Sequence, residues 1–542
     1  MMYLNDQGIE GASNRQEWTG KGYRLPEYNR SQVRELTKEA PFWIHFGAGN
    51  IFRAFQANVV QNLLNEGELE KGLVVVEGYD YEIIEKVYNP HDDLNILVTL
   101  KADGNIDKTV VGSIVESHIL DTGNKEERER IEEIFTKDSL QIVSFTITEK
   151  GYQLTDAKGR LFPGVEKDFA AGPEAAASYM GKVTALLYRR YLDGQKPIAM
   201  VSMDNCSHNG DKLYVAVTAF ADQWVGNGLA EAGFSDYIRD RSKVSFPWTM
   251  IDKITPRPDA SVEAILTKDG VAEQTPVVTS ANTYIAPFVN AEECEYLVIE
   301  DVFPNGRPAL EKGGVIFTSR ERVNKVEKMK VCTCLNPLHT TLAVYGCLLG
   351  YEKISEEMKD EDLKKLIETV GYEEGLPVVV DPGILDPKEF IDTVINVRIP
   401  NPFMPDTPQR IATDTSQKLA IRFGETIKAY EASKELRVSD LKMIPLVLAG
   451  WLRYLMAIDD NGNPFSLSPD PLLDEVCPHL QKVVFGMGDE VKDILRPVLE
   501  NQNIFGVDLY ENGMAESICE YFKELSAGKG AVRATLGKYL RK

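Results

Sequence analysis

A lysine, an asparagine and a histidine that could act together in proton transfer lie in the ten-residue segment Lys330–His339. A lysine amine serves as a general acid or base when burial or nearby cations lower its pKa towards neutrality. The Asn336 amide can donate a hydrogen bond to a substrate oxygen, and the His339 imidazole can hold that oxygen in place. The segment therefore favours chemistry at a carbonyl or alcohol oxygen. A capped helix start with an ordinary core histidine is the alternative.

Two cysteines in this segment, Cys332 and Cys334, raise the question of a metal site. Their C-x-C spacing lacks both the C-x-x-C pair and the second ligand pair of a structural zinc site, so no metal is predicted. The seven cysteines are scattered over 542 residues and do not form a disulfide framework. This composition favours a reducing compartment, with the cysteines as packing residues.

A glycine-rich turn earlier in the chain suggests a nucleotide site. Gly47 and Gly49 separate a predicted buried strand at residues 42–46 from a predicted helix at residues 53–64. Glycines in this context let the backbone approach a pyrophosphate, and a helix N-terminus attracts its charge. Because Phe52 stands where the third glycine of the usual fingerprint would be, a turn without a ligand remains the alternative.

Two charged residues near this turn could contact a dinucleotide. Glu77 ends the second predicted strand, where a carboxylate can bind the adenosine ribose and repel a 2′-phosphate. Glu77 lies 30 residues after Gly47, whereas the ribose-binding acid usually lies about 20 residues after the glycine turn. Asp80 is therefore an alternative for this role. Arg53 could add a cation for the phosphates. Both residues could equally be solvated charges.

Further polar residues occur where a substrate could bind. Asn205 follows the predicted strand at residues 197–202, and ligands of open parallel sheets bind beyond the carboxyl ends of strands. Asp252 lies between apolar neighbours and is either an inward-facing polar group or a turn residue. Arg410 and Lys418 could contact hydroxyl or carboxylate groups, although isolated cations are more often solvated.

The elements that must position these residues change in character along the chain. Short apolar strands alternate with helical patterns between residues 41 and 322, which predicts a parallel sheet covered on both faces. Residues 323–542 show helical patterns and predict a mostly helical second domain. Residues 1–40 are polar and are expected to form an irregular extension on the surface. The predicted strands cover residues 42–46, 73–76, 141–147 and 197–202, and the main predicted helices cover residues 53–64, 180–192, 339–349, 357–370, 416–436, 441–458, 491–501 and 514–525.

The net charge of −23 argues against nucleic acid or an anionic membrane surface as a partner. The polar N-terminus lacks an apolar signal core. The most apolar segment, residues 443–456, is too short to span a membrane and contains Pro445 and Arg453, so it is expected to be a buried helix. A cytoplasmic protein is predicted.

Several motifs occur in an order that resembles the long-chain polyol dehydrogenase family of mannitol dehydrogenases, fructuronate reductases (mannonate oxidoreductases) and tagaturonate reductases. These motifs are Gly47–Gln56, Thr148–Tyr152, Asp204–Asn205 with Asn209–Gly210, Ile251–Pro256, Ile299–Pro308, and Asn336 with His339. The resemblance implies an α/β, Rossmann-like dinucleotide-binding domain followed by a mostly α-helical domain, with the active site between them.

The resemblance also implies roles for individual residues. Lys330 would be the acid/base and Glu327 would carry its proton. Asn205 and Asn336 would polarise the substrate oxygen, and His339 would orient it. The implied substrate contacts are Asp252, Arg410 and Lys418, and the implied NAD-binding residues are Gly47, Gly49, Asn50, Ile51, Arg53 and Glu77.

The chain departs from the family in places. Five residues separate Lys330 from Asn336, where the family usually has four, so Lys328 remains an alternative acid/base. Phe52 and Phe55 stand where histidines are common, and Lys253 stands where arginine is usual.

The predicted function is NAD-dependent hydride transfer between a keto-hexuronate and an aldonate, with fructuronate and mannonate favoured. Tagaturonate with altronate, and fructose with mannitol, remain alternatives. A sugar epimerase and a non-catalytic NAD sensor are rivals from other classes. The expected partner is a small sugar acid or polyol, and the expected state is a monomer or small homo-oligomer.

Overall fold

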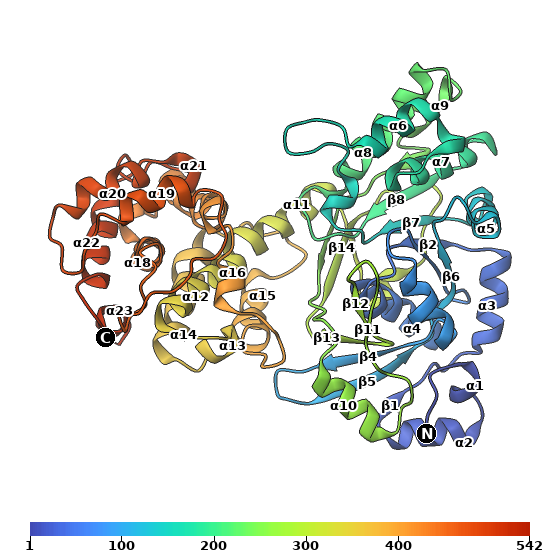
Figure 1. Cartoon of the computed structure of the whole chain (residues 1–542), viewed down its shortest axis with the longest axis horizontal. Helices are drawn as coiled ribbons and strands as arrows, with labels where there is room; N and C mark the ends of the chain where they lie inside the picture. The colour runs from blue at the N-terminus through green and yellow to red at the C-terminus, as the bar shows by residue number, and fades with distance from the viewer. Residues whose placement is uncertain (542) are drawn as a thin grey trace. The chain divides into compact units, whose positions relative to one another are not determined.

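The computed structural model describes residues 1–541, which form two compact units (Figure 1). Unit 1 comprises Met1–Lys101 and Asn105–Asn324, and unit 2 comprises Ala102–Gly104 together with the chain from Lys325 onwards. The division lies within helix α11 (Arg320–Met329), close to the boundary expected after residue 322.

The main sheet of unit 1 has six parallel strands in the order β6-β3-β2-β7-β8-β9. The predicted parallel sheet is therefore confirmed. The strand order reverses between β2 and β7, and such a switch point is where open α/β sheets bind ligands. The strands are β2 (Trp43–Phe46), β3 (Leu73–Glu77), β6 (Ile114–Ile119), β7 (Ile142–Phe145), β8 (Ile198–Ser202) and β9 (Val244–Ser245).

Both faces of this sheet are buried, which explains why its strands are continuously apolar. Ile44 and Val74 point into one core, which they share with α5 (Lys125–Thr136), α7 (Tyr179–Leu192) and α8 (Asn209–Gly226). Their neighbours Trp43 and Val75 point into a second core, which they share with α4 (Ala57–Asn65). The alternation follows from the two-residue period of a strand.

Unit 1 also contains short strands that the sequence analysis did not anticipate. They form a four-stranded sheet in the order β1-β5-β4-β13, a three-stranded sheet in the order β10-β14-β15, and the pair β11-β12. Their bounds are β1 (Tyr23–Arg24), β4 (Asn95–Leu100), β5 (Ile106–Val111), β10 (Thr249–Asp252), β11 (Val277–Val278), β12 (Tyr284–Ile285), β13 (Phe288–Glu292), β14 (Tyr296–Glu300) and β15 (Ile316–Thr318). Unit 1 also contains the helices α6 (Pro163–Ala171), α9 (Gly233–Arg239) and α10 (Ala260–Asp269).

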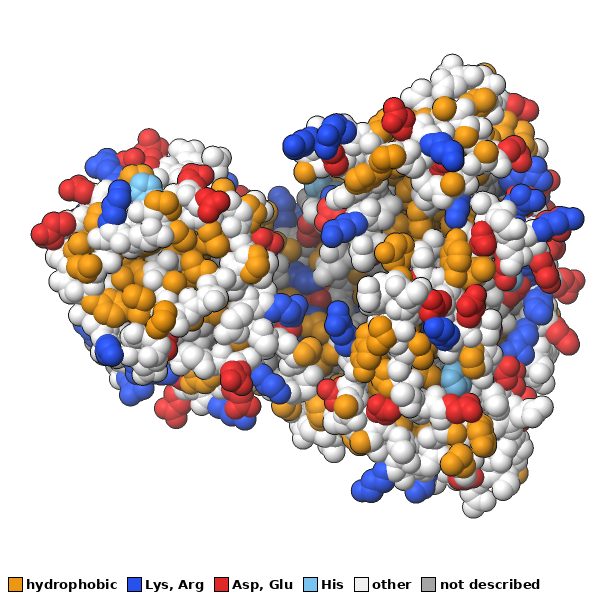
Figure 2. Space-filling view, viewed as in Figure 1, with side chains coloured by type: hydrophobic (Ala, Val, Ile, Leu, Met, Phe, Trp, Pro, Cys, Tyr) orange, Lys and Arg blue, Asp and Glu red, His pale blue; other side chains and the backbone are white. Residues whose placement is uncertain are grey.

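Acidic and basic side chains are interspersed on the face of each unit that Figure 2 shows. The whole chain nevertheless carries 83 acidic and 60 basic residues. An anionic ligand would therefore need local cations to offset the overall negative field.

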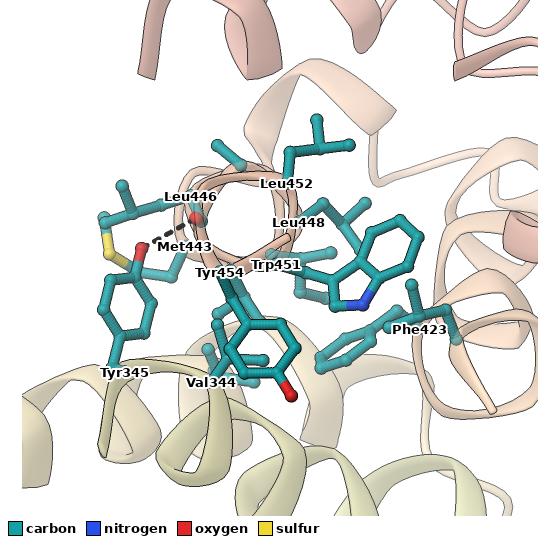
Figure 3. Packing of buried hydrophobic residues seen from close by; sticks show 14 of the residues in the cluster. Val344, Tyr345, Phe423, Met443, Leu446, Leu448, Trp451, Leu452 and Tyr454 are labelled. Carbon is teal, nitrogen blue, oxygen red and sulfur yellow. Dashed lines mark hydrogen bonds between the residues drawn. The ribbon is translucent and has the colours of Figure 1, made fainter. Parts of the chain in front are cut away.

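Unit 2 is mostly helical, as predicted. Its core surrounds α18 (Met443–Tyr454), in which every residue is buried (Figure 3). The Tyr345 hydroxyl on α12 (Asn336–Leu349) donates a hydrogen bond to the Leu446 carbonyl at 2.8 Å. The apolar segment near residue 443 is thus a buried helix. Within residues 1–541, no helix has both the length and the apolar character needed to cross a membrane.

The other helices of unit 2 pack around this centre. They are α13 (Ile354–Glu357), α14 (Glu361–Glu368), α15 (Pro387–Thr393), α16 (Pro408–Ile411), α17 (Glu425–Ala432), α19 (Leu473–Leu480), α20 (Val491–Leu499), α21 (Gln502–Phe505), α22 (Ala515–Leu525) and α23 (Ala531–Leu540), with π-helical turns at η7 (Lys330–Cys334) and η12 (Ala420–Gly424).

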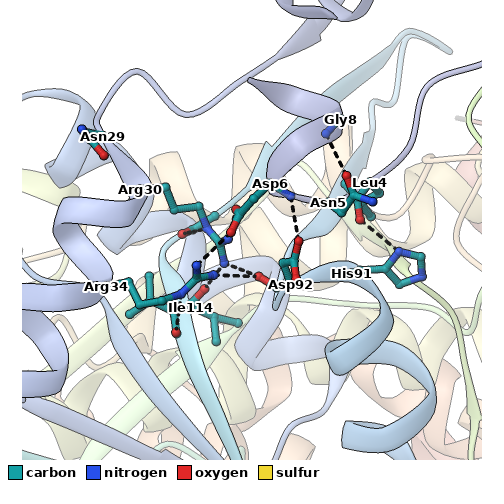
Figure 4. A network of polar contacts seen from close by, with 12 residues as sticks. Leu4, Asn5, Asp6, Gly8, Asn29, Arg30, Arg34, His91, Asp92 and Ile114 are labelled. Atoms are coloured by element: carbon teal, nitrogen blue, oxygen red, sulfur yellow. Dashed lines mark hydrogen bonds and ion pairs between the residues drawn. The ribbon is translucent and has the colours of Figure 1, made fainter. Parts of the chain in front are cut away.

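The first 40 residues differ from the expected irregular extension, because they fold into unit 1 as α1 (Asp6–Ile9), α2 (Ala12–Gly20), β1 and α3 (Arg30–Glu39). Asp6 forms ion pairs with Arg30 and Arg34 (Figure 4). Arg30 also donates to the Ile114 carbonyl at 2.8 Å. The prediction from polar composition was wrong because the charged side chains of this segment pair with one another and with backbone carbonyls inside unit 1.

Candidate active site

The turn after β2 is held tightly between the ends of two neighbouring strands. The Gly47 N–H donates to the Val76 carbonyl at 2.9 Å. Gly47 has φ +111°, and a Cβ there would lie 2.3 Å from the Thr146 carbonyl oxygen, so only glycine fits. At Gly49, by contrast, no atom lies within 4 Å of the Cβ position. The backbone at Gly49 is therefore open to a ligand.

Glu77 lies directly against this turn. Its carboxylate accepts hydrogen bonds from the backbone N–H groups of Ala48 at 2.9 Å, Tyr79 at 2.8 Å and Asp80 at 3.1 Å. The long interval in sequence is no obstacle, because β2 and β3 are adjacent parallel strands. Asp80, the alternative acid, is buried and accepts a hydrogen bond from the Thr279 hydroxyl.

A cavity of about 640 Å³ opens beyond the carboxyl ends of β2, β3 and β7. This size is typical of small-molecule sites. Gly47, Gly49 and Glu77 line it together with Thr146, Thr148 and Tyr179. The cavity lies at the switch point of the sheet, where a dinucleotide binds in folds of this type.

Asn50, Ile51 and Arg53 occupy the first helical turn but are not among the residues that line the cavity. Arg53 is buried and donates to the Ala286 carbonyl and to the Asn50 side-chain oxygen, each at 2.8 Å. The guanidinium thus fixes the start of the helix. The predicted direct contact of Arg53 with phosphate gains no support from this position.

Asp204 organises one wall of the cavity, and sequence reasoning noticed it only as part of a motif. Its carboxylate accepts hydrogen bonds from the N–H of Thr148 at 2.8 Å and from the hydroxyl of Tyr152 at 2.5 Å. Burial raises the pKa of Asp204, while its hydrogen bonds oppose that shift. An aspartate two residues after the end of a buried strand was the available signal.

Asn205 lies in a loop and Asp252 in a strand, and the buried amide of Asn209 connects the two segments. Asn205 is exposed in the loop after β8, and Asp252 is buried at the end of β10. Asn209 donates to the Asp204 carbonyl at 2.9 Å and to the Thr249 hydroxyl at 2.8 Å. Unit 1 therefore links the Asn205 loop to the strand that carries Asp252.

The two candidate lysines of unit 2 differ in their exposure to solvent. Lys330 is only 4% exposed, whereas Lys328 is an exposed residue of α11. A lysine acid/base must be partly withdrawn from water, and this condition favours Lys330. Glu327 is half-buried one helical turn before Lys330.

Asn336 and His339 lie three residues apart at the start of α12 and share one helix face. Thr340 lies one helical turn after Asn336, and its hydroxyl donates to the Asn336 carbonyl at 3.0 Å. Lys418 donates to the Thr413 carbonyl at 2.5 Å. Arg410 is exposed and forms an ion pair with Asp406.

Family comparisons identify the chain. The family described as "Mannitol dehydrogenase Rossmann domain" matches residues 42–312, and "Mannitol dehydrogenase C-terminal domain" matches residues 322–526. This chain belongs to the mannitol dehydrogenase family. The resemblance read from the motifs is therefore confirmed.

Relatives within the mannitol dehydrogenase family extend over the whole chain. D-mannonate oxidoreductase of Thermotoga maritima is 53% identical over 99% of this chain and 98% of its own length. The structure of Pseudomonas fluorescens mannitol 2-dehydrogenase in a ternary complex with NAD and D-mannitol has a TM-score of 0.68 and 26% sequence identity. The match covers 100% of this chain and 100% of that chain. A crystal structure of D-sorbitol dehydrogenase in substrate-free form shares the fold, with a TM-score of 0.79 and 24% sequence identity. The match covers 99% of this chain and 100% of that chain.

The structure explains one departure from the usual mannitol dehydrogenase spacing. The extra residue between Lys330 and Asn336 falls in η7, where the Leu335 N–H donates to the Lys330 carbonyl at 3.1 Å. This bond spans five residues, and such a π-helical turn accommodates one residue more than an α-helical turn. Lys330 can thus keep its place in the family pattern despite the longer interval.

Proposed function

We propose that this protein catalyses reversible, NAD-dependent hydride transfer between D-mannonate and its keto acid, D-fructuronate. The observation that carries the proposal is the 53% identity with D-mannonate oxidoreductase over nearly the full length of both chains. The cavity at the switch point of unit 1 supplies a site of suitable size for a dinucleotide.

The residues around this cavity fit NAD. The open backbone at Gly49 allows a pyrophosphate to approach, and Gly47 makes the tight turn that precedes it. Asn50, Ile51 and Arg53 form the helix start behind the turn. The Glu77 carboxylate lies where it can bind the ribose and repel a 2′-phosphate, which favours NAD over NADP.

When bound, NAD accepts a hydride from the substrate carbon or returns it. Lys330 would take the hydroxyl proton during oxidation and return it during reduction, and Glu327 would exchange that proton with water. Asn205 and Asn336 would donate hydrogen bonds to the substrate oxygen while its charge changes. Each such donor is worth about 3–4 kcal/mol in the oxyanion sites of other enzymes.

The remaining site residues would position the substrate. His339 would orient the reacting oxygen, and Asp252, Arg410 and Lys418 would bind other oxygens of the sugar chain. The buried position of Lys330 and the shared helix face of Asn336 and His339 support these roles.

The decisive experiment follows NADH absorbance with fructuronate, tagaturonate and fructose as separate substrates. Oxidation of NADH by fructuronate in clear preference to the other two is expected. Preference for tagaturonate or fructose would reassign the substrate within the family. NADH binding without any turnover would favour a sensor, and sugar conversion without net absorbance change would favour an epimerase.

A further inference from the structure

Arg422 is a cation that the proposed mechanism does not use. It lies in η12, and burial lowers the pKa of its guanidinium to about 10, so the group is still charged at neutral pH. Among residues 1–541, no aspartate or glutamate forms an ion pair with it. A desolvated charge without a counter-ion is costly, and a bound anion would offset that cost.

The hydrogen bonds of Arg422 leave one edge of its guanidinium available. Its Nη1 donates to the Thr340 hydroxyl. Its Nε and Nη2 donate to no other atom of the described chain, and neither is sealed from solvent. These two N–H groups point in parallel from the same edge, which is the geometry that binds a carboxylate through both oxygens.

Lys418 strengthens the positive potential at this position. The Arg422 N–H donates to the Lys418 carbonyl at 2.9 Å, so the two residues are one helical turn apart. Burial and the charge of Arg422 lower the pKa of Lys418. Its amine donates to a backbone carbonyl, and it too forms no ion pair with a carboxylate in the described part of the chain. Arg410 differs, because Asp406 neutralises it.

The free edge lies close to the proposed substrate-binding residues of unit 2. Thr340, which holds the guanidinium, lies one helical turn after Asn336 on the same helix face. Thr340 lies four positions after Asn336 in the α-helix, which is a rise of about 6 Å. That rise matches the length of a six-carbon sugar acid, whose carboxylate lies at the far end of the chain from its keto group.

We propose that Arg422, assisted by the charge of Lys418, binds the carboxylate of the sugar-acid substrate through Nε and Nη2. This contact would select a hexuronate or aldonate over an uncharged ketose or polyol. The inference rests on the proposed function and adds the residue that distinguishes substrate class.

The test measures substrate selection and binding in Arg422→Gln and Arg422→Lys, with Arg496→Gln as control, since Arg496 is an exposed arginine that pairs with Glu500. In Arg422→Gln, kcat/KM for fructuronate should fall about 10- to 100-fold, while fructose reduction stays within about threefold. Calorimetry of D-mannonate binding to the NADH-saturated enzyme should show the same loss of affinity. Because NADH and D-mannonate cannot react with each other, this measurement reports binding without turnover.

Arg422→Lys keeps the charge but loses the paired donors, so its affinity for mannonate should be intermediate. Unchanged mannonate affinity in the Gln or Lys variant would overturn the inference, as would an equal loss for fructuronate and fructose. Circular dichroism checks folding, and the Lys variant carries the test if the Gln variant does not fold. Absence of fructuronate turnover in the wild type would reject the proposed function and this inference together, whereas a wild-type kcat/KM for fructuronate in Arg422→Gln would reject the inference alone.

Discussion

The Glu77 carboxylate accepts a hydrogen bond from the Ala48 N–H at 2.9 Å, across 29 positions of sequence. This contact joins the acid that ends β3 to the glycine turn that follows β2. One carboxylate can thus shape the turn and place a negative charge beside the cavity.

Glu77→Gln should separate these two effects. Glutamine removes the charge that repels a 2′-phosphate and keeps one of the two acceptor oxygens, whereas alanine removes both. We expect the ratio of kcat/KM for NADPH to that for NADH to rise about tenfold. Glu77→Ala should instead weaken the use of both cofactors, because the turn loses its acceptor. An unchanged cofactor ratio in Glu77→Gln would show that another residue excludes NADP.

Lys330→Ala should lower kcat by about 10²- to 10⁴-fold, the usual contribution of a positioned acid or base. NADH binding, measured by fluorescence titration, should stay within about threefold of the wild type, because the cavity that we assign to NAD lies in unit 1. The matched control is Lys328→Ala, which alters an exposed residue and should remain active. The opposite pattern in the two variants would transfer the acid/base role to Lys328.

A chelator should leave activity unchanged. Burial raises the pKa of Cys332 to about 11 and that of Cys334 to about 12. A metal binds the thiolate, so this burial makes metal binding by the two side chains less favourable. Activity assayed before and after dialysis against EDTA tests this point. A loss that added zinc restores would assign a metal to the enzyme.

Glu357 should make the protein less stable as the pH rises. Its carboxyl group is fully buried, and neither oxygen has a hydrogen-bond partner in the described chain. Burial raises the pKa of Glu357 well above its ordinary value. The neutral form is favoured in the folded state, so its stabilising contribution is present below the unfolded pKa, near 4.5, and is lost as the pH rises towards the folded pKa.

Glu357→Gln should remove this dependence, because an amide has no proton to lose. The melting temperature of the variant relative to the wild type should increase between pH 5 and pH 8. The underlying free-energy difference grows by up to about 1.4 kcal/mol per pH unit. Parallel melting curves for the two proteins across this range would contradict the assignment.

Glu374 caps the central helix of unit 2. Its carboxylate accepts hydrogen bonds from the N–H groups of Lys442 and Met443, each at 2.6 Å, and of Ile444 at 2.7 Å. Glu374→Ala leaves these donors without partners and should cost about 2–4 kcal/mol. Urea unfolding of the full chain measures the loss. A change below about 0.5 kcal/mol would mean that water replaces the carboxylate without penalty.

The sequence by itself determined the fold class and the order of the main elements, because these depend on local patterns. Continuous apolar strands such as Leu73–Glu77 require a sheet that is buried on both faces, and the helical periodicity after residue 325 requires helix packing. The glycine turn and the segment Lys330–His339 were visible for the same reason, since their chemistry lies in neighbouring residues.

Only the tertiary structure decided which distant residues meet. Sequence spacing could not show that Glu77 reaches Ala48, that Asp204 holds Thr148, or that Arg422 donates to Thr340. It favoured Lys330 over Lys328 but left the choice open, although Lys328 is exposed and Lys330 is buried. Burial and hydrogen bonding between distant segments depend on how the whole chain packs, and no local pattern of residues records that packing.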